Sequence, residues 1–121
     1  MARPVPPPLE LLCLRILWDM GESSAGSVRQ ALPNSKPLAY TTVTTLLDRL
    51  MGRGVVSRRK VGRAYVYRAE ATREEMQRAA VASLVESLFD GSEMRLIQFV
   101  QSNSVGAAAP AAAEDLDTVL L

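Results

Sequence analysis

Apolar side chains recur at helical spacing in three successive segments near the start of the chain. The first segment begins at Leu9 and ends before Gly21, and Ser24 is a suitable N-cap for a second, shorter helix that stops at Pro33. A third helix is expected over residues 39–53. The apolar sides of the three helices are formed, in turn, by Leu9, Leu12, Cys13, Ile16, Leu17 and Met20; by Ala25, Val28, Ala31 and Leu32; and by Ala39, Val43, Leu46, Leu47 and Leu50.

Residues 55–68 follow a different pattern, in which apolar and polar positions alternate with a period of two. Such alternation is typical of β-strands, and the two alternating runs meet at Val61-Gly62. The pattern therefore predicts a β-hairpin that turns at this point. Three basic residues are expected close to its tip: Arg59, Lys60 and Arg63.

Helical spacing returns after the hairpin. Thr72 can open a helix over residues 72–89, and Ser92 can open another over residues 92–101. Their apolar positions are Met76, Ala80, Leu84, Val85, Leu88, Phe89, Leu96, Phe99 and Val100. Because the preceding domain already has a core of its own, we expect a second copy of the chain to cover these positions. The alternative is that both helices fold back onto the same domain.

Together these elements predict a mainly α-helical protein with a small β-hairpin. Residues 9–71 have the element order of a winged helix-turn-helix domain, and residues 72–121 are expected to form C-terminal dimerisation helices. An Ala-rich linker is expected near 105–113. The Pro-rich lead at residues 1–8 is expected to be disordered.

Charge is distributed unevenly, although the net charge of the chain is only +1. Residues 36–68 hold eight basic residues and one acid, Asp48, which is a net charge of +7. Residues 69–121 carry a net charge of −6, and residues 1–35 carry none. The positive field is thus confined to the third helix and the hairpin.

The third helix contains Thr41, Thr42, Thr44 and Thr45, although β-branched residues are poor helix formers. Thr41 and Thr45 lie opposite the apolar side, and Thr42 and Thr44 flank them. On such a face a hydroxyl can bond a phosphate or base edge, and a methyl can touch a thymine methyl. Either feature alone, exposed threonines or a basic hairpin, can be ordinary solvated surface. Their combination predicts double-stranded DNA binding, with helix 39–53 in the major groove and wing 55–68 on the flanking backbone. The candidate DNA-binding residues are Thr41, Thr42, Thr44, Thr45, Arg49, Arg53, Arg58, Arg59, Lys60 and Arg63. The alternative is a winged-helix module that docks an acidic protein partner.

Other classes of function are disfavoured by what the chain lacks. It has no histidine, one cysteine at an inward helical position, and no phosphate-binding glycine loop, so no catalytic residue, metal or cofactor is expected. No apolar run is long enough to span a bilayer, and prolines stand where a signal peptide would be apolar. The protein is therefore expected to be cytoplasmic, without membrane insertion.

Three stretches carry a family resemblance: LELLCLRILWDMGESSAGSVRQAL, PLAYTTVTTLLDRLMGRGVVSRRKVGRAYVYRAEATREE and SLFDGSEMRLIQFVQ. They resemble the penicillinase-repressor family, the BlaI/MecI type of winged-helix transcriptional regulators, over about residues 9–101. The resemblance implies a homodimeric repressor that occludes a palindromic operator, with C-terminal helices interlocked with those of the partner. It also implies that five residues of the third helix face the operator, Thr41, Thr42, Thr44, Thr45 and Arg49, and that residues 60–63 form the wing tip.

The chain departs from the family at a regulatory position. Members that respond to β-lactams are cleaved at an Asn-Phe bond when a membrane sensor is triggered, and the matching pair here is Gln98-Phe99. A membrane sensor protease is thus one candidate partner, although the cleaved sequence differs. Copper-responsive relatives carry paired cysteines near the C-terminus, and no cysteine follows Cys13, so that device is excluded.

Overall fold

The computed structural model describes residues 4–103, and the structural statements below refer to them. They fall into two compact units, an N-terminal unit ending at Ala80 and a C-terminal unit beginning at Val81, and each is described by itself. The predicted linker at 105–113 lies outside the described residues, as do the first three residues of the Pro-rich lead. Residues 4–7 form neither helix nor strand, yet Pro6 is buried.

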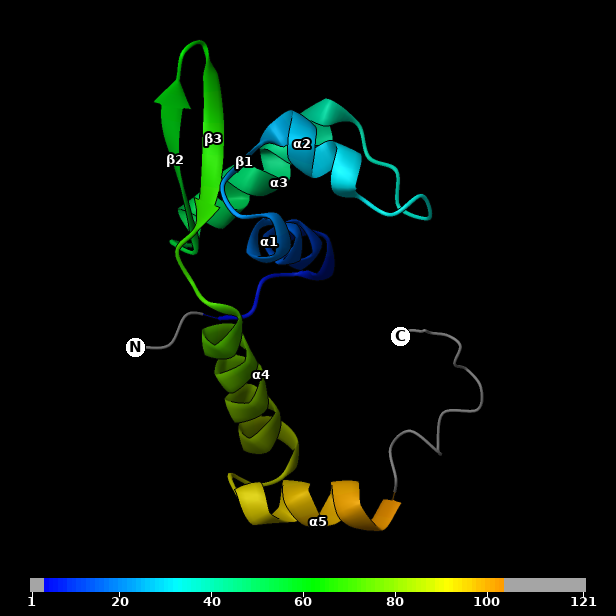
Figure 1. The fold of residues 1–121 in the computed structure, drawn as a ribbon. Helices are drawn as coiled ribbons and strands as arrows, with labels where there is room; N and C mark the ends of the chain where they lie inside the picture. The colour runs from blue at the N-terminus through cyan, green and yellow to red at the C-terminus, as the bar shows by residue number, and fades with distance from the viewer. Residues whose placement is uncertain (1–3, 104–121) are drawn as a thin grey trace. The chain divides into compact units, whose positions relative to one another are not determined.

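The N-terminal unit combines helices with a small antiparallel sheet (Figure 1). In chain order its elements are α1 (Pro8–Met20), β1 (Ser23–Ser24), α2 (Ala25–Ala31), α3 (Tyr40–Gly52), β2 (Val56–Val61), β3 (Ala64–Ala69) and the first turns of α4 (Arg73–Leu88). The predicted fold class, mainly helical with a β-hairpin, is confirmed.

Local signals in the sequence explain where the helices begin and end. Pro8 occupies the first turn of α1, where its missing N–H costs nothing, and Gly21 ends the helix with φ +82°. The side chain of Ser24 accepts a hydrogen bond from the N–H of Ser27 over 3.1 Å, which confirms it as the N-cap of α2. The turn to α3 begins after Leu32, the C-cap of α2.

The core of the N-terminal unit is broader on α1 than the predicted stripe. Leu14 is fully buried although it was not predicted, whereas Leu9 and Met20 are exposed. The reason is that α1 packs against α2, α3 and β3, so its middle is enclosed on several sides while its ends extend past these neighbours. Ala31 and Ala39 are also exposed, contrary to prediction, because they lie at the ends of their helices. The predicted inward residues of α3 proper are confirmed as buried: Val43, Leu46, Leu47 and Leu50.

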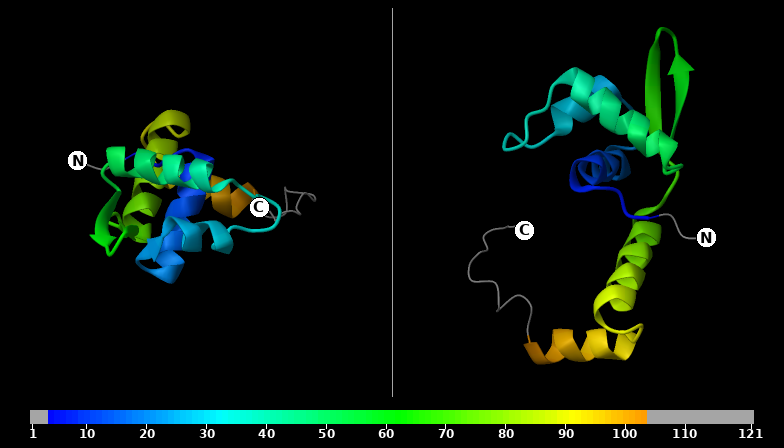
Figure 2. Two further views of the ribbon diagram at one scale, coloured as in Figure 1. Left: turned by 90° about the horizontal axis from the view of Figure 1, so that it is seen from above. Right: turned by 180° about the vertical axis from the view of Figure 1, so that it is seen from behind.

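The sheet has the strand order β1-β3-β2. Val61 pairs with Ala64, so the loop of the hairpin is Gly62-Arg63, one residue later than predicted. Gly62 has φ +63°, which suits the first position of a type II′ turn and favours glycine there. Strand β1 was not predicted, because two residues cannot display an alternation. The hairpin rises at the C-terminal end of α3, as the view from behind in Figure 2 shows.

The start of α4 is fastened to α1. The indole N–H of Trp18 donates to the carbonyl of Ala71 over 2.8 Å, and Arg73 pairs with Asp19 at 2.8 Å while lying over the Trp18 ring. Met76 is consequently buried in the core of the N-terminal unit. This corrects its predicted place on the dimerisation surface, since its side chain is already covered within its own domain.

The C-terminal unit contains the remainder of α4 and α5 (Glu93–Asn103). Asp90 and Gly91 both have positive φ, and the N–H of Gly91 donates to the carbonyl of Val85, so the chain turns sharply between the helices. Ser92 caps α5, as predicted. The rings of Phe89 and Phe99 lie 5.7 Å apart across the turn.

Candidate nucleic-acid interface

The threonines of α3 are exposed, except that Thr44 is half-buried. The hydroxyls of Thr44 and Thr45 both donate to the backbone carbonyl of Thr41, over 2.8 and 2.9 Å. A threonine hydroxyl has one hydrogen, and in both residues that hydrogen is already bonded inside the helix. The parts left for an outside partner are therefore the methyl groups and the oxygen lone pairs.

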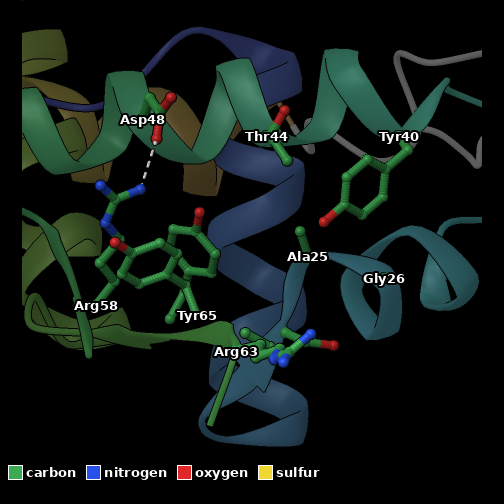
Figure 3. A pocket seen from close by; sticks show the side chains of 11 residues that line it. Ala25, Gly26, Tyr40, Thr44, Asp48, Arg58, Arg63 and Tyr65 are labelled. Atoms are coloured by element: carbon green, nitrogen blue, oxygen red, sulfur yellow. Dashed lines mark ion pairs between the residues drawn. The ribbon is translucent and has the colours of Figure 1, made fainter. Parts of the chain in front are cut away.

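A cleft of about 530 Å³ separates α3 from the hairpin (Figure 3). Its α3 side presents Tyr40, Thr44 and Asp48, which are four residues apart and thus follow one line along the helix. The opposite sides present Arg58, Arg63, Ala64, Tyr65 and Tyr67 from the hairpin and Ser24, Ala25 and Gly26 from the start of α2. Helix α3 and the wing therefore face one shared cleft.

The other predicted residues of α3 line a second, shallower hollow of about 310 Å³. Its lining consists of Thr41, Thr42, Thr45, Leu46 and Arg49 from α3 and Leu9 from α1. The threonines are thus divided, with Thr44 facing the wing and the other three facing the opposite flank of the helix.

Arg58 bridges the wing and α3 across the cleft. Its guanidinium lies 3.6 Å from the carboxylate of Asp48 and 4.1 Å from the centre of the Tyr65 ring. A hydrogen bond that Arg58 donates to Tyr67 is the main cause that raises the pKa of Arg58 above its ordinary value. The cation is therefore held in place by two aromatic residues of β3 as well as by the carboxylate.

Some basic residues of the wing are paired with a carboxylate and others are not. Arg59 makes two hydrogen bonds of 2.8 Å to the carboxylate of Glu22, which lowers the pKa of that carboxyl and raises the pKa of Arg59. Arg63 lies in the loop at the hairpin tip, and Lys60 lies close to it on β2. Within residues 4–103 neither of them takes part in an ion pair. The tip therefore carries the unmatched positive charge of the wing.

Two predicted DNA-binding residues, Arg49 and Arg53, lie at the C-terminal end of α3. Arg53 directs its Nε to Oε1 of Glu10 over 2.6 Å, so part of its guanidinium is engaged within the domain. Arg49 has no ion pair among the described residues and lines the second hollow. The structure thus places Arg53 away from the cleft that joins α3 and the wing.

The tyrosines of the cleft were not among the predicted DNA-binding residues. Tyr40 is 53% exposed at the first residue of α3, and Tyr65 lies beside Arg58 on the wing. The alternation did place Tyr65 and Tyr67 on one face of their strand. Nothing local, however, indicated that this face meets α3, because the strands and the helix meet only in the tertiary structure.

A helix-turn-helix formed by α2 and α3, followed by a hairpin that shares a cleft with the second helix, defines a winged helix-turn-helix protein. The sequence matches the penicillinase repressor family over residues 7–120, and the chain belongs to that family. The resemblance inferred from its motifs is confirmed. The protein is a DNA-binding transcription regulator.

Two solved structures are similar to the chain. An ArsR-like transcriptional regulator from Rhodococcus sp. RHA1 has 26% sequence identity and a TM-score of 0.47, with 77% of this chain and 79% of that chain covered. A MarR family protein from Bacillus stearothermophilus has 22% identity and a TM-score of 0.49, with 79% and 69% covered. A comparison with curated proteins finds no match.

Two further observations concern the described residues only. None of their helices is long and apolar enough to cross a lipid bilayer. No group of three or more cysteine, aspartate or glutamate side chains among them is arranged to hold a metal ion.

Proposed function

We propose that the protein is a homodimeric, non-catalytic transcriptional repressor that occludes a palindromic operator in the cytoplasm. The observation that carries this proposal is the shared cleft, in which Thr44 of α3 and Arg63 of the wing tip face each other's elements. A duplex needs such an arrangement to place one element in its major groove and the other on its backbone. The confinement of positive charge to these two elements supports the same conclusion.

In this proposal α3 contacts bases and the wing contacts phosphates. Thr41, Thr42, Thr45 and Arg49 lie on the free flank of α3 and meet base edges, while Lys60 and Arg63 bind phosphates without regard to sequence. Arg58 and Arg59 reach phosphates only by exchanging their carboxylate partners. Arg53 is assigned mainly to holding α3 in place.

Dimerisation is proposed to use the C-terminal unit. Its large apolar side chains are exposed along both helices: Val81, Leu84, Leu88, Met94, Ile97, Phe99 and Val100. So much exposed apolar surface on a short segment indicates an interaction site. Of the other predicted positions, Ala80 is exposed at the end of the N-terminal unit, and Phe89 and Leu96 are both half-buried. Val85 is buried, which corrects its predicted place on the dimerisation surface. A twofold dimer presents two copies of α3 about 34 Å apart, which matches operator half-sites one helical turn apart.

Regulated cleavage at Gln98-Phe99 by a membrane sensor protease stays a prediction. Both residues are exposed, but they lie inside α5, and Phe99 packs on Phe89. A protease needs an extended substrate, so cleavage requires local unwinding of α5.

The salt dependence of DNA binding tests the proposal. If each subunit neutralises about four phosphates, log K against log salt should have a slope of about −7 for the dimer. Arg63→Ala should weaken binding to operator and mismatched duplex alike and reduce the slope by about 2, because one phosphate contact per subunit is lost. Arg78→Ala, which removes a cation paired with Glu74 on α4, is the matched control and should change neither quantity.

The same titration, followed by fluorescence anisotropy of a labelled duplex, separates the alternative function. A module that docks an acidic protein would show no preference among duplexes and a slope near zero. That result would reject the DNA-binding assignment of α3 and the wing.

A further inference from the structure

Asp48 carries a negative charge in the most positively charged segment of the chain. It is the only acid in the segment of residues 36–68, which carries a net charge of +7. On α3 it lies opposite the buried side of the helix, between the angular positions of Thr44 and Thr41, and its side chain is 58% exposed. A carboxylate here lines the cleft, between the flank of α3 that the proposed function gives to base edges and the wing that it gives to phosphates, and phosphates repel it.

The ion pair between Asp48 and Arg58 is weak enough for either side chain to take another partner. Its oxygen lies 3.6 Å from the Arg58 guanidinium, which is longer than a hydrogen bond, and both side chains are solvent-accessible. Arg58 keeps Tyr65 and Tyr67 as partners when the carboxylate leaves. Glu22, another acid paired with the wing, differs because it accepts two hydrogen bonds of 2.8 Å from Arg59.

We propose that Asp48 is a specificity-determining residue that accepts a hydrogen bond from the amino group of a cytosine in the major groove. This inference rests on the proposed function. An ionised carboxylate only accepts hydrogen bonds, so the acceptor edges of guanine and thymine repel it. Adenine offers an amino group next to the N7 acceptor, whereas the N4 amino group of cytosine has no neighbouring acceptor in the groove.

The Asp48 carboxylate distinguishes operator from other duplexes in two ways: it attracts cytosine, and it weakens binding where cytosine is absent. On a duplex without a cytosine at the matching position, Asp48 gains no donor and remains close to the phosphates. Non-specific binding is therefore weakened more than operator binding. On the operator, Arg58 is released from Asp48 and is free to approach the adjacent phosphate.

Selection from a pool of random duplexes tests the proposal whatever the operator sequence is. The wild-type chain and Asp48→Asn are each used to select duplexes, and the selected base frequencies are compared. Asp48→Asn should lose the preference for cytosine by about tenfold at one base pair in each half-site and gain adenine there, because an amide side chain pairs with N6 and N7 of adenine. Asp48→Ala should lose the preference without gaining another.

Glu22→Gln is the matched control. It removes an equal charge from the same domain and frees a wing arginine, so it should strengthen binding to all duplexes while keeping the wild-type base preferences. Thermal unfolding should be unchanged in Asp48→Asn, because the side chain is exposed.

The outcomes distinguish the two proposals. A wild-type motif that is selected unchanged by Asp48→Asn and Asp48→Ala would overturn the role of Asp48 and leave the proposed function standing. A wild-type chain that enriches no motif at all would remove the proposed function itself.

Discussion

Arg53, the C-cap residue of α3, donates from its Nε to the carboxylate of Glu10 in the first turn of α1 over 2.6 Å. The side chain of Glu10 is only 4% exposed, and that of Arg53 is 33% exposed. The pair joins the end of the helix that carries the threonines to the start of the first helix. It therefore fixes the position of α3 in the domain before any ligand binds.

Arg53→Ala should destabilise the protein by about 2 kcal/mol. Removing the donor leaves a buried carboxylate without its partner, and the cost is lower than for a fully buried pair because Arg53 is partly hydrated. Urea unfolding followed by circular dichroism measures the change. Arg78→Ala, which breaks the exposed pair with Glu74, should leave the midpoint unchanged, and equal effects of the two substitutions would contradict a special role for the buried pair.

Cys13 should make stability fall with rising pH in alkaline solution. Burial, reinforced by the charge of Glu10, raises the pKa of its thiol from 9.0 to about 11. The folded state therefore holds the proton more tightly than the unfolded state, so its advantage is complete below pH 9 and is lost as the pH rises from 9 to about 11. The free energy of unfolding of the wild type minus that of Cys13→Ala, measured across this range, isolates the thiol. A flat difference would contradict the burial effect.

Thr45 should contribute to operator recognition through its methyl group. Its hydroxyl hydrogen is already bonded to the carbonyl of Thr41, so Thr45→Val should retain discrimination between operator and mismatched duplex. Thr45→Ala and Thr45→Ser should each lose it, by about fivefold or more. Anisotropy titrations with both duplexes measure the ratio. If Thr45→Val loses as much as Thr45→Ala, the hydroxyl rather than the methyl meets the DNA.

Leu88→Glu should convert the dimer to a monomer. Leu88 is 72% exposed on α4, and a charge there would have to be buried in the proposed interface. Sedimentation velocity at a concentration where the wild type is dimeric should show the shift, and operator affinity should fall with it. Ser83→Glu places the same charge on the exposed surface of the same helix and should remain dimeric. Dimers of Leu88→Glu would rule out this surface.

Much of the fold follows from signals that act over a few residues. The buried side of α3, the Ser24 cap of α2 and the stop at Gly21 were all predictable, because helical period and capping depend only on neighbours within about one turn. The same locality explains why the alternation revealed the hairpin but missed β1, whose two residues become a strand only by pairing with Tyr67 and Val66.

The candidate site was likewise predictable only where its features depend on residues close together in the sequence. The chain alone determined that four threonines and a cluster of cations occupy adjacent elements, and it revealed the family through the motifs on those elements. Only the tertiary structure decided that Thr44 faces the wing while Thr45 faces away. It also decided that Arg53 forms an ion pair with Glu10 and that Met76 is covered by its own domain. These outcomes depend on packing between residues far apart in the sequence, which no local pattern encodes.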